Sequence, residues 1–146
     1  MRKAASIAAI VFGVVLIAAA GITWFVVSDT LRDQNITTAE DACLHDRTVA
    51  GPFTAYCQAK IIDEHTLGIT DGRTYAELDR DDPLRATAMN SAFLQASLFT
   101  SVLAFGVSAM AAGMGVLFIL IGLGMRDVRQ LGEPARTPDM NHRESL

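Results

Sequence analysis

The chain has 146 residues, enough for one modest domain or for a pair of membrane spans with a small domain attached. Its 51% hydrophobic content is unevenly distributed, because no charged residue occurs from Ala4 to Val27 or from Ala86 to Met125. The formal net charge of −4 argues against the basic face that nucleic-acid binding requires, so no nucleic-acid partner is expected.

The first apolar run predicts a transmembrane helix over residues 4–27, since about 20 apolar residues of helix cross a hydrocarbon core of ~30 Å. A cleaved signal peptide is the alternative, because Met1-Arg2-Lys3 precedes the run and the small residues of "AAAG" offer a cleavage site after Ala20. The run nevertheless continues past that point, and Trp24 takes the place of an interfacial aromatic anchor. These features favour an uncleaved anchor.

Residues 28–82 are expected to form a small helical domain between the spans. Thr37-Thr38-Ala39-Glu40 has the pattern of a capping box and predicts a short helix through Leu44. Gly51-Pro52 ends that helix and begins a second one, because proline suits the first helical turn. A second capping box, Thr74-Tyr75-Ala76-Glu77, predicts a third short helix.

The second helix of this domain is expected to end by Gly68. Its apolar periodicity puts one stripe on the packed face, made of Phe53, Cys57 and Ile61. A turn follows at residues 70–73, where Asp-Gly occurs.

Asp82-Pro83 predicts the start of a second long helix, with Asp82 as the helix cap and Pro83 in the first turn. This helix is expected to run to Met125. Residues 83–97 are too polar for lipid and are assigned to a stalk, and residues 98–125 to the second transmembrane helix. The domain between the spans would pack on the stalk through Leu84, Ala88 and Phe93.

Charge placement predicts the orientation of both spans. Arg2 and Lys3 precede the first span, and Arg126 and Arg129 follow the second, whereas residues 28–85 carry twelve Asp and Glu against six Arg and Lys. The positive-inside rule therefore puts residues 1–3 and the tail 126–146 in the cytoplasm. The fold class is thus an all-α plasma-membrane protein with two transmembrane helices, both termini inside, and an extracytoplasmic helical domain. The tail is expected to be mobile, because its composition is mixed-charge with Gly and Pro.

Small side chains recur along both spans and predict close helix packing. The rows expected to do this are Ala5, Ala9 and Gly13 in the first span, and Ala104, Ser108 and Ala112 in the second. Either the two spans pack on each other, which is the simpler interpretation, or one row receives a partner protein.

The two cysteines, Cys43 and Cys57, lie in the segment predicted to face an oxidising compartment, where disulfides persist. A structural disulfide is therefore favoured. The alternative is a metal site, since Cys43, His45, Cys57 and His65 supply two sulfurs and two nitrogens, a set that suits zinc. The spacing of these four residues is poor for zinc, and no metal or other cofactor is expected.

The stretches "AGPFTAYCQAKIIDEHTLGITDGRTYAELDRDDPLRATAMN" and "SAFLQASLFTSVLAFGVSAMAAGMGVLFILIGLG" resemble a family of small actinobacterial two-span membrane proteins. These proteins are often described automatically as "aromatic ring-opening dioxygenase, LigA subunit". Ring-opening dioxygenases are soluble complexes with iron in the large subunit, and two membrane spans do not fit that class. The resemblance implies a plasma-membrane protein and transfers no functional residues.

No ionisable side chain lies within either apolar run, which argues against a transporter or a proton relay. The sequence favours a non-enzymatic membrane protein with no catalytic residues and no small-molecule substrate. Its expected contacts are the lipid bilayer and either a membrane-protein partner or further copies of itself, in the role of an accessory or scaffold subunit of a cell-envelope complex. The alternative function is an extracytoplasmic ligand- or metal-binding sensor that uses His45, His65 and the acidic loop.

Overall fold

The computed structural model describes residues 2–131 of the chain. Within that range the fold consists of three helices, α1 (Arg2–Asp33), α2 (Pro52–Ile69) and α3 (Arg85–Leu131). Strands are absent from the described residues, where a single β-bridge joins Thr37 and Thr48. The predicted all-α class is therefore confirmed for the described part of the chain, and the predicted mobility of residues 132–146 lies outside it.

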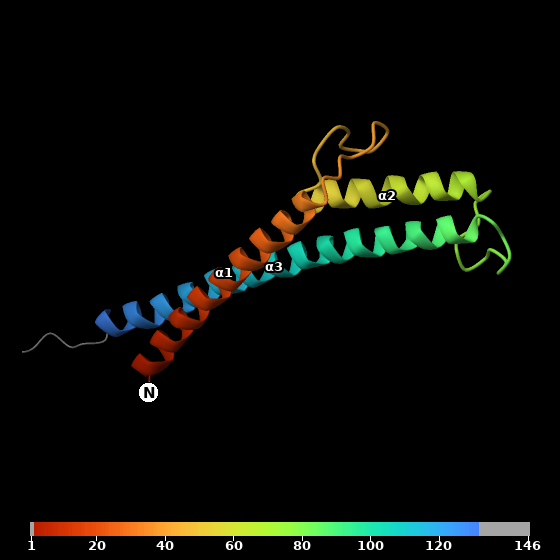
Figure 1. Cartoon of the computed structure of the whole chain (residues 1–146). Coiled ribbons are helices and arrows are strands. Elements are labelled where there is room, and N and C mark those ends of the chain that lie inside the picture. Colours follow the sequence, from red (N-terminus) through yellow and green to blue (C-terminus); the bar gives the residue numbers. More distant parts are fainter. Residues whose placement is uncertain (1, 132–146) are drawn as a thin grey trace, which may run out of the picture.

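The two long helices, α1 and α3, are each long and apolar enough to cross a membrane. α3 has 47 residues, which corresponds to roughly 70 Å of helix. Its C-terminal half packs against α1, and its N-terminal half packs against α2 (Figure 1). One helix of about twice the membrane thickness thus joins the apolar pair to the segment between the two long helices.

The contact between α1 and α3 repeats every seven residues. In the described structure the buried small residues of α1 up to Ala20 are Ser6, Gly13 and Ala20, and those in the facing half of α3 are Ser108, Gly115 and Gly122. A seven-residue repeat keeps one stripe of each helix facing its partner when the helices coil around each other with a left-handed twist. The partners run antiparallel, because residues early in α1 meet residues late in α3.

Two glycines let the backbones of α1 and α3 approach closely. A Cβ atom added at Gly115 would lie 2.7 Å from the carbonyl oxygen of Gly13, and one added at Gly13 would lie 2.5 Å from the carbonyl oxygen of Gly115. About two turns further along, the hydroxyl of Ser6 donates a hydrogen bond to the carbonyl oxygen of Gly122 at 2.6 Å. In lipid, such close packing and interhelical hydrogen bonds are what hold two helices together.

The small-residue rows expected from the sequence overlap this contact only in part. Gly13 and Ser108 are buried in it, whereas Ala9, Ala104 and Ala112 are half-buried and Ala5 is exposed. A four-residue spacing drifts around a helix by about 40° at each step, so it leaves the facing stripe within a few turns. A seven-residue spacing falls only about 20° short of two full turns, and supercoiling of the helices corrects this difference. It therefore indicates the buried stripe better than the four-residue spacing does.

Replacing Gly115 with Ala is expected to destabilise the α1–α3 pair by about 1–3 kcal/mol, because the new methyl group overlaps a backbone atom that cannot rotate away. The matched control is Gly113→Ala, two residues away on the same helix, where a Cβ meets nothing within 4 Å. Unfolding in mixed micelles, followed through the fluorescence of Trp24, measures the difference. Equal midpoints for the two variants would contradict the glycine contact.

The three helices meet in one apolar cluster around Phe105, whose side chain is 1% exposed. The other buried members come from the end of α1, the chain before α2, the first turns of α2, and α3: Leu31, Val49, Ala55, Ala59 and Leu98. The ring of Trp24 contacts that of Phe105 edge-on, with 4.7 Å between ring centroids. This junction fixes the domain between the spans to the helix pair.

Beyond the junction, α2 and α3 are joined by polar side chains. The hydroxyls of Thr66 and Ser91 share a hydrogen bond, and Gln95 Nε2 donates to Asp63 Oδ1 at 3.2 Å. Such contacts help to fix the register of the two antiparallel helices, because they pair particular positions of α2 with particular positions of α3.

The predicted second helix is observed as α2, with Pro52 at its first position. The Thr54 hydroxyl accepts the backbone N–H groups of Ala50 and Gly51, each at 3.2 Å. The predicted turn also forms, since Asp71 and Gly72 take positive φ angles of 53° and 79° directly after the helix.

Two residues expected on packed faces are exposed instead. Phe53 is 76% exposed, because α2 contacts α3 through its other side, where Ala55 and Ala59 are buried. Phe93 is 67% exposed, because it lies two residues from Ser91, which corresponds to roughly 200° of helix rotation away from α2. The predictions for both phenylalanines were wrong.

The predicted short helices at Thr37 and Thr74 are also not helices. Glu77 does accept the N–H and the hydroxyl of Thr74, at 2.7 and 2.8 Å, but only a single turn follows.

The long helix α3 begins at Arg85 rather than Pro83. Asp82 nevertheless precedes it as a local cap, with its Oδ1 accepting the N–H of Leu84 at 2.9 Å.

Candidate functional site

The strongest candidate for a specialised site is the segment between α1 and α2, residues 34–51, together with the side of α2 that it covers. Cys43 in this segment and Cys57 in α2 form a disulfide with their Cα atoms 5.4 Å apart. That separation is typical of native disulfides. The bond ties the middle of the loop to the second turn of α2.

The loop turns around the hydroxyl of Thr38. This oxygen donates to the carbonyl of Leu44 and accepts the backbone N–H of Arg47 at 3.0 Å. The main chain adds a bond from the N–H of Thr38 to the carbonyl of Arg47 at 2.9 Å. Threonine competes for backbone groups in this way outside helices, which explains why the expected capping box gave a compact turn.

Two side chains of α2 hold the outer part of the loop. Gln58 Oε1 accepts the N–H of Ala39 at 3.2 Å, and His65 Nε2 lies 2.6 Å from Asp41 Oδ2. The Asp41 and His65 side chains are more than half exposed, so the pair is screened by water and contributes little to stability. It serves chiefly to set the position of the loop along α2.

The hydrogen bond from His65 holds the pKa of the Asp41 carboxyl below its ordinary value. Because the folded-state pKa is the lower one, the pair stabilises the fold above about pH 4, and this contribution is lost as the pH falls through the lowered pKa. In a carboxyl-carbon NMR titration, we expect the midpoint of Asp41 to rise in His65→Ala.

Glu77 is the internal control for that titration. The backbone N–H and hydroxyl of Thr74 lower the pKa of Glu77, and His65 makes no contribution to that shift. Its midpoint is therefore expected to stay constant in His65→Ala. An unchanged Asp41 midpoint beside an unchanged Glu77 would contradict the pairing of Asp41 with His65.

The four residues of the zinc alternative are not brought together as a ligand set. Cys43 and Cys57 are bonded to each other, and His65 is paired with Asp41. Over the described residues, no group of three or more His, Cys, Asp and Glu side chains is placed to hold a metal ion. The binding role of His45 and His65 stays a prediction.

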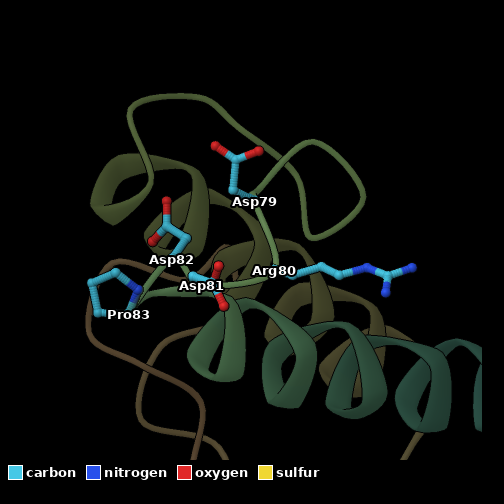
Figure 2. Close-up of a pocket in the computed structure, with 5 residues that line it drawn as sticks. All are labelled: Asp79, Arg80, Asp81, Asp82 and Pro83. Atoms are coloured by element: carbon cyan, nitrogen blue, oxygen red, sulfur yellow. The ribbon is translucent and has the colours of Figure 1, made fainter.

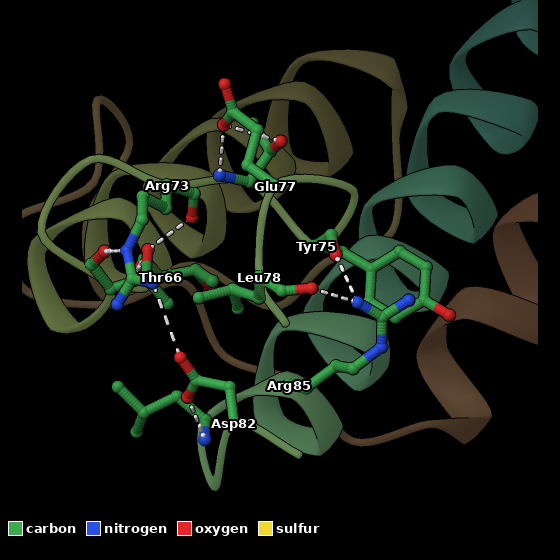
Figure 3. Close-up of polar contacts among 10 residues, drawn as sticks. Thr66, Arg73, Tyr75, Glu77, Leu78, Asp82 and Arg85 are labelled. Carbon is green, nitrogen blue, oxygen red and sulfur yellow. Dashed lines mark hydrogen bonds and ion pairs between the residues drawn. The ribbon is translucent and has the colours of Figure 1, made fainter. Parts of the chain in front are cut away.

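The far end of α2 and the start of α3 form a second polar cluster (Figure 3). Arg73 Nη1 lies 3.4 Å from Asp82 Oδ2, across the turn that joins the two helices. Arg85 bonds to the carbonyl oxygens of Tyr75 and Leu78, and its guanidinium lies 4.3 Å from the centre of the Tyr75 ring. These contacts close the connection between α2 and α3.

A shallow, open polar pocket lies beside this cluster, lined by residues 79–83 (Figure 2). Its acidic groups do not converge, since Figure 2 shows the carboxylates of Asp79 and Asp81 pointing in different directions. Asp82 is already engaged by Arg73 and by the N–H of Leu84. The pocket is therefore best explained as the outer surface of a helix cap.

Several contacts escaped the sequence analysis. The pairing of His65 with Asp41 and the role of Thr38 depend on a loop path that no local pattern encodes. The seven-residue repeat of small residues in α1 and α3 was present in the sequence and could have been found by testing periods of 3.5 as well as four.

The loop 34–51 is held on α2 by the disulfide and by hydrogen bonds to Gln58 and His65, a geometry that indicates a structural role. The side chains of Asp41 and His65 are exposed and paired with each other, and the disulfide removes both thiols from chemistry. The resemblance to the small actinobacterial membrane proteins stays a prediction. No protein-family model, no curated protein and no solved structure matches this chain.

Proposed function

We propose that the chain is a two-span plasma-membrane protein with both termini in the cytoplasm, and that it acts without enzymatic activity as an accessory or scaffold subunit of a membrane complex. The basic residues that flank the two apolar runs support this orientation, as does the acidic character of residues 28–85.

Retention of α1 follows from its packing. A cut after Ala20 would remove Ser6 and Gly13, which contact Gly122 and Gly115 of α3. α3 would then expose a glycine-lined groove with no partner. The interlocking of the two helices therefore supports an uncleaved first span.

The observation that carries the scaffold role is the outer face of α3 beyond the span. Residues 86–97 contain no charge, although this part of the helix extends past the end of α1. α2 covers one side of it, and the opposite side exposes Phe93 and Met89. A charge-free helix face that displays large apolar side chains is typical of a protein-interaction surface.

The chemistry of this face suits a helix of a partner membrane protein. Small or weakly polar exposed side chains flank Phe93, among them Ala92, Ala96 and Ser97, beside the larger exposed Met89 and Leu94. Small residues beside one large anchor let a second helix approach closely and seat the ring between its side chains. Because the face continues into the span, one partner helix could contact α3 both inside and outside the membrane.

Photo-crosslinking in native membranes tests this role. A benzoylphenylalanine at position 93 is expected to give a discrete crosslinked product, which mass spectrometry then identifies. The matched control carries the same group at Lys60, an exposed position on α2 that lies among charged side chains. No product at position 93, or identical products at both positions, would contradict the scaffold proposal.

A further inference from the structure

The first two turns of α2 have the composition of a membrane-facing surface. Residues 48–59 carry no charge, whereas Lys60, Asp63 and Glu64 follow directly. Within this charge-free stretch Phe53 is 76% exposed and Tyr56 is 49% exposed. Two exposed aromatic rings beside a glycine and a proline are unusual for a helix end surrounded by water.

The contacts of α2 place this helix end level with the last apolar turns of α1. Ala55 belongs to the same buried cluster as Phe105. Phe105 in turn contacts Trp24, which lies within the charge-free run of α1. Figure 1 shows the start of α2 beside the end of α1, against the middle of α3.

The exposed rings of α2 are continuous with the apolar surface of α3. The Tyr56 and Phe99 rings lie edge-on, with 6.1 Å between their centroids. Phe99 and Leu103 are themselves exposed, and they lead along α3 into the span. A single apolar surface therefore runs from the membrane-spanning part of α3 onto the first turn of α2.

We propose that the N-terminal turn of α2, through Phe53 and Tyr56, inserts into the interfacial region of the lipid bilayer. This inference rests on the membrane placement proposed above and adds a third protein–lipid contact to the two spans. Aromatic rings favour this region, since it accommodates an apolar body together with the polar hydroxyl of a tyrosine.

The local backbone suits a water-poor environment. Pro52 has no N–H group to leave unpaired, and the Thr54 hydroxyl accepts the N–H groups of Ala50 and Gly51. Exposed backbone donors are costly in lipid, so this internal pairing lowers the cost of bringing the helix end into the interface. The charged residues that begin at Lys60 then mark where α2 leaves it.

Single-tryptophan quenching tests this inference with the full chain. Trp24 is the only tryptophan, so Trp24→Phe provides a silent background that keeps an aromatic ring against Phe105. Tryptophan is then introduced separately by Phe53→Trp, Val14→Trp and Ile69→Trp. Each variant is placed in nanodiscs that hold one copy, with phosphatidylcholine and phosphatidylglycerol brominated near the top of the acyl chains.

The three positions make a matched set. Val14 is an exposed residue in the middle of the α1 apolar run and reports insertion of the span. Ile69 is 54% exposed at the other end of α2, and its distance of 16 residues from Phe53 corresponds to roughly 24 Å of helix. The Trp24→Phe background could itself impair folding. The Phe53 and Ile69 substitutions are therefore repeated with Trp24 retained, and the signal of Trp24 is subtracted.

We expect bromolipid quenching at Phe53→Trp to be at least as strong as that at Val14→Trp, with blue-shifted emission, since interfacial residues sit ~5–10 Å into the headgroup and acyl boundary, close to the bromines. Ile69→Trp is expected to stay unquenched.

Quenching at Val14→Trp with none at Phe53→Trp would overturn the inference and leave the spans intact. Absence of quenching at Val14→Trp would overturn the membrane placement itself. A blue shift at Phe53→Trp that appears without quenching, only in discs with two copies, would assign the surface to a second copy and overturn the lipid contact.

Discussion

Phe105→Ala is expected to destabilise the protein by about 3–5 kcal/mol, which would be the largest effect of any single substitution considered. The side chain is 1% exposed and lies where all three helices meet. Its loss leaves a cavity that Trp24, Leu98 and Ala55 can fill only if the helices shift. We therefore expect both the α1–α3 pair and the attached α2 domain to loosen together.

Pulse proteolysis across an SDS titration in mixed micelles measures this change. The matched control is Val107→Ala, two residues along α3, where the side chain is exposed and faces away from the junction. It is expected to shift the midpoint little. If Phe105→Ala behaved like Val107→Ala, the three-helix junction would not be the structural centre that its burial indicates.

Removal of the disulfide is expected to have the second largest effect, about 3 kcal/mol in the chain-entropy account for a closed loop of this length. The double variant Cys43→Ser/Cys57→Ser avoids leaving a reactive thiol. The loop 34–51 would keep the Thr38 contacts but lose its covalent tie to α2. Cleavage by trypsin at Arg47 should become faster as the loop opens more often.

Reductant provides the control for this prediction. Dithiothreitol should accelerate cleavage of the native protein to the rate of the double serine variant, and it should leave that variant unchanged. Alkylation before reduction should find no free thiol in protein extracted from the membrane. Free thiols in freshly extracted protein, or equal cleavage of native and variant chains, would contradict the cross-link.

The sequence was most informative about the long helices. Two charge-free runs and the Asp82-Pro83 pair located the starts of α1 and α3 to within two residues, because length and charge exclusion act over many positions at once. Each helix continues six residues past its predicted end. Gly51-Pro52 likewise located the start of α2, since proline at the first helical position has a suitable φ angle and leaves no N–H group unpaired.

Short-range patterns were less reliable because tertiary contacts outweighed them. Thr37, the expected helix cap, pairs with Thr48 in a β-bridge, and the hydroxyl of the adjacent Thr38 closes a turn. Glu77 caps one turn that never extends. The free energy of a capping box is about 1 kcal/mol, which cannot nucleate a helix in a segment already constrained by a disulfide and a β-bridge.

Which face of each helix is buried could be predicted only when the correct period was used. Phe53 and Phe93 are large and apolar, and in a soluble domain they would belong to the core. Here both are exposed, and the small residues Ala55, Ala59 and Ser91 are buried in their place. In the membrane placement proposed above, close approach of helices depends on small side chains, and large ones are free to face the bilayer or a partner.

The central claim is that two helices cross the membrane and hold the disulfide-closed domain outside the cell. Labelling of intact cells with a membrane-impermeant maleimide tests it most directly, using Thr74→Cys between the spans and Ser145→Cys near the end of the chain. The paired native cysteines do not react. The account predicts that Thr74→Cys is labelled in intact cells and Ser145→Cys only after lysis. Labelling of Ser145→Cys in intact cells, or protection of Thr74→Cys until lysis, would contradict it.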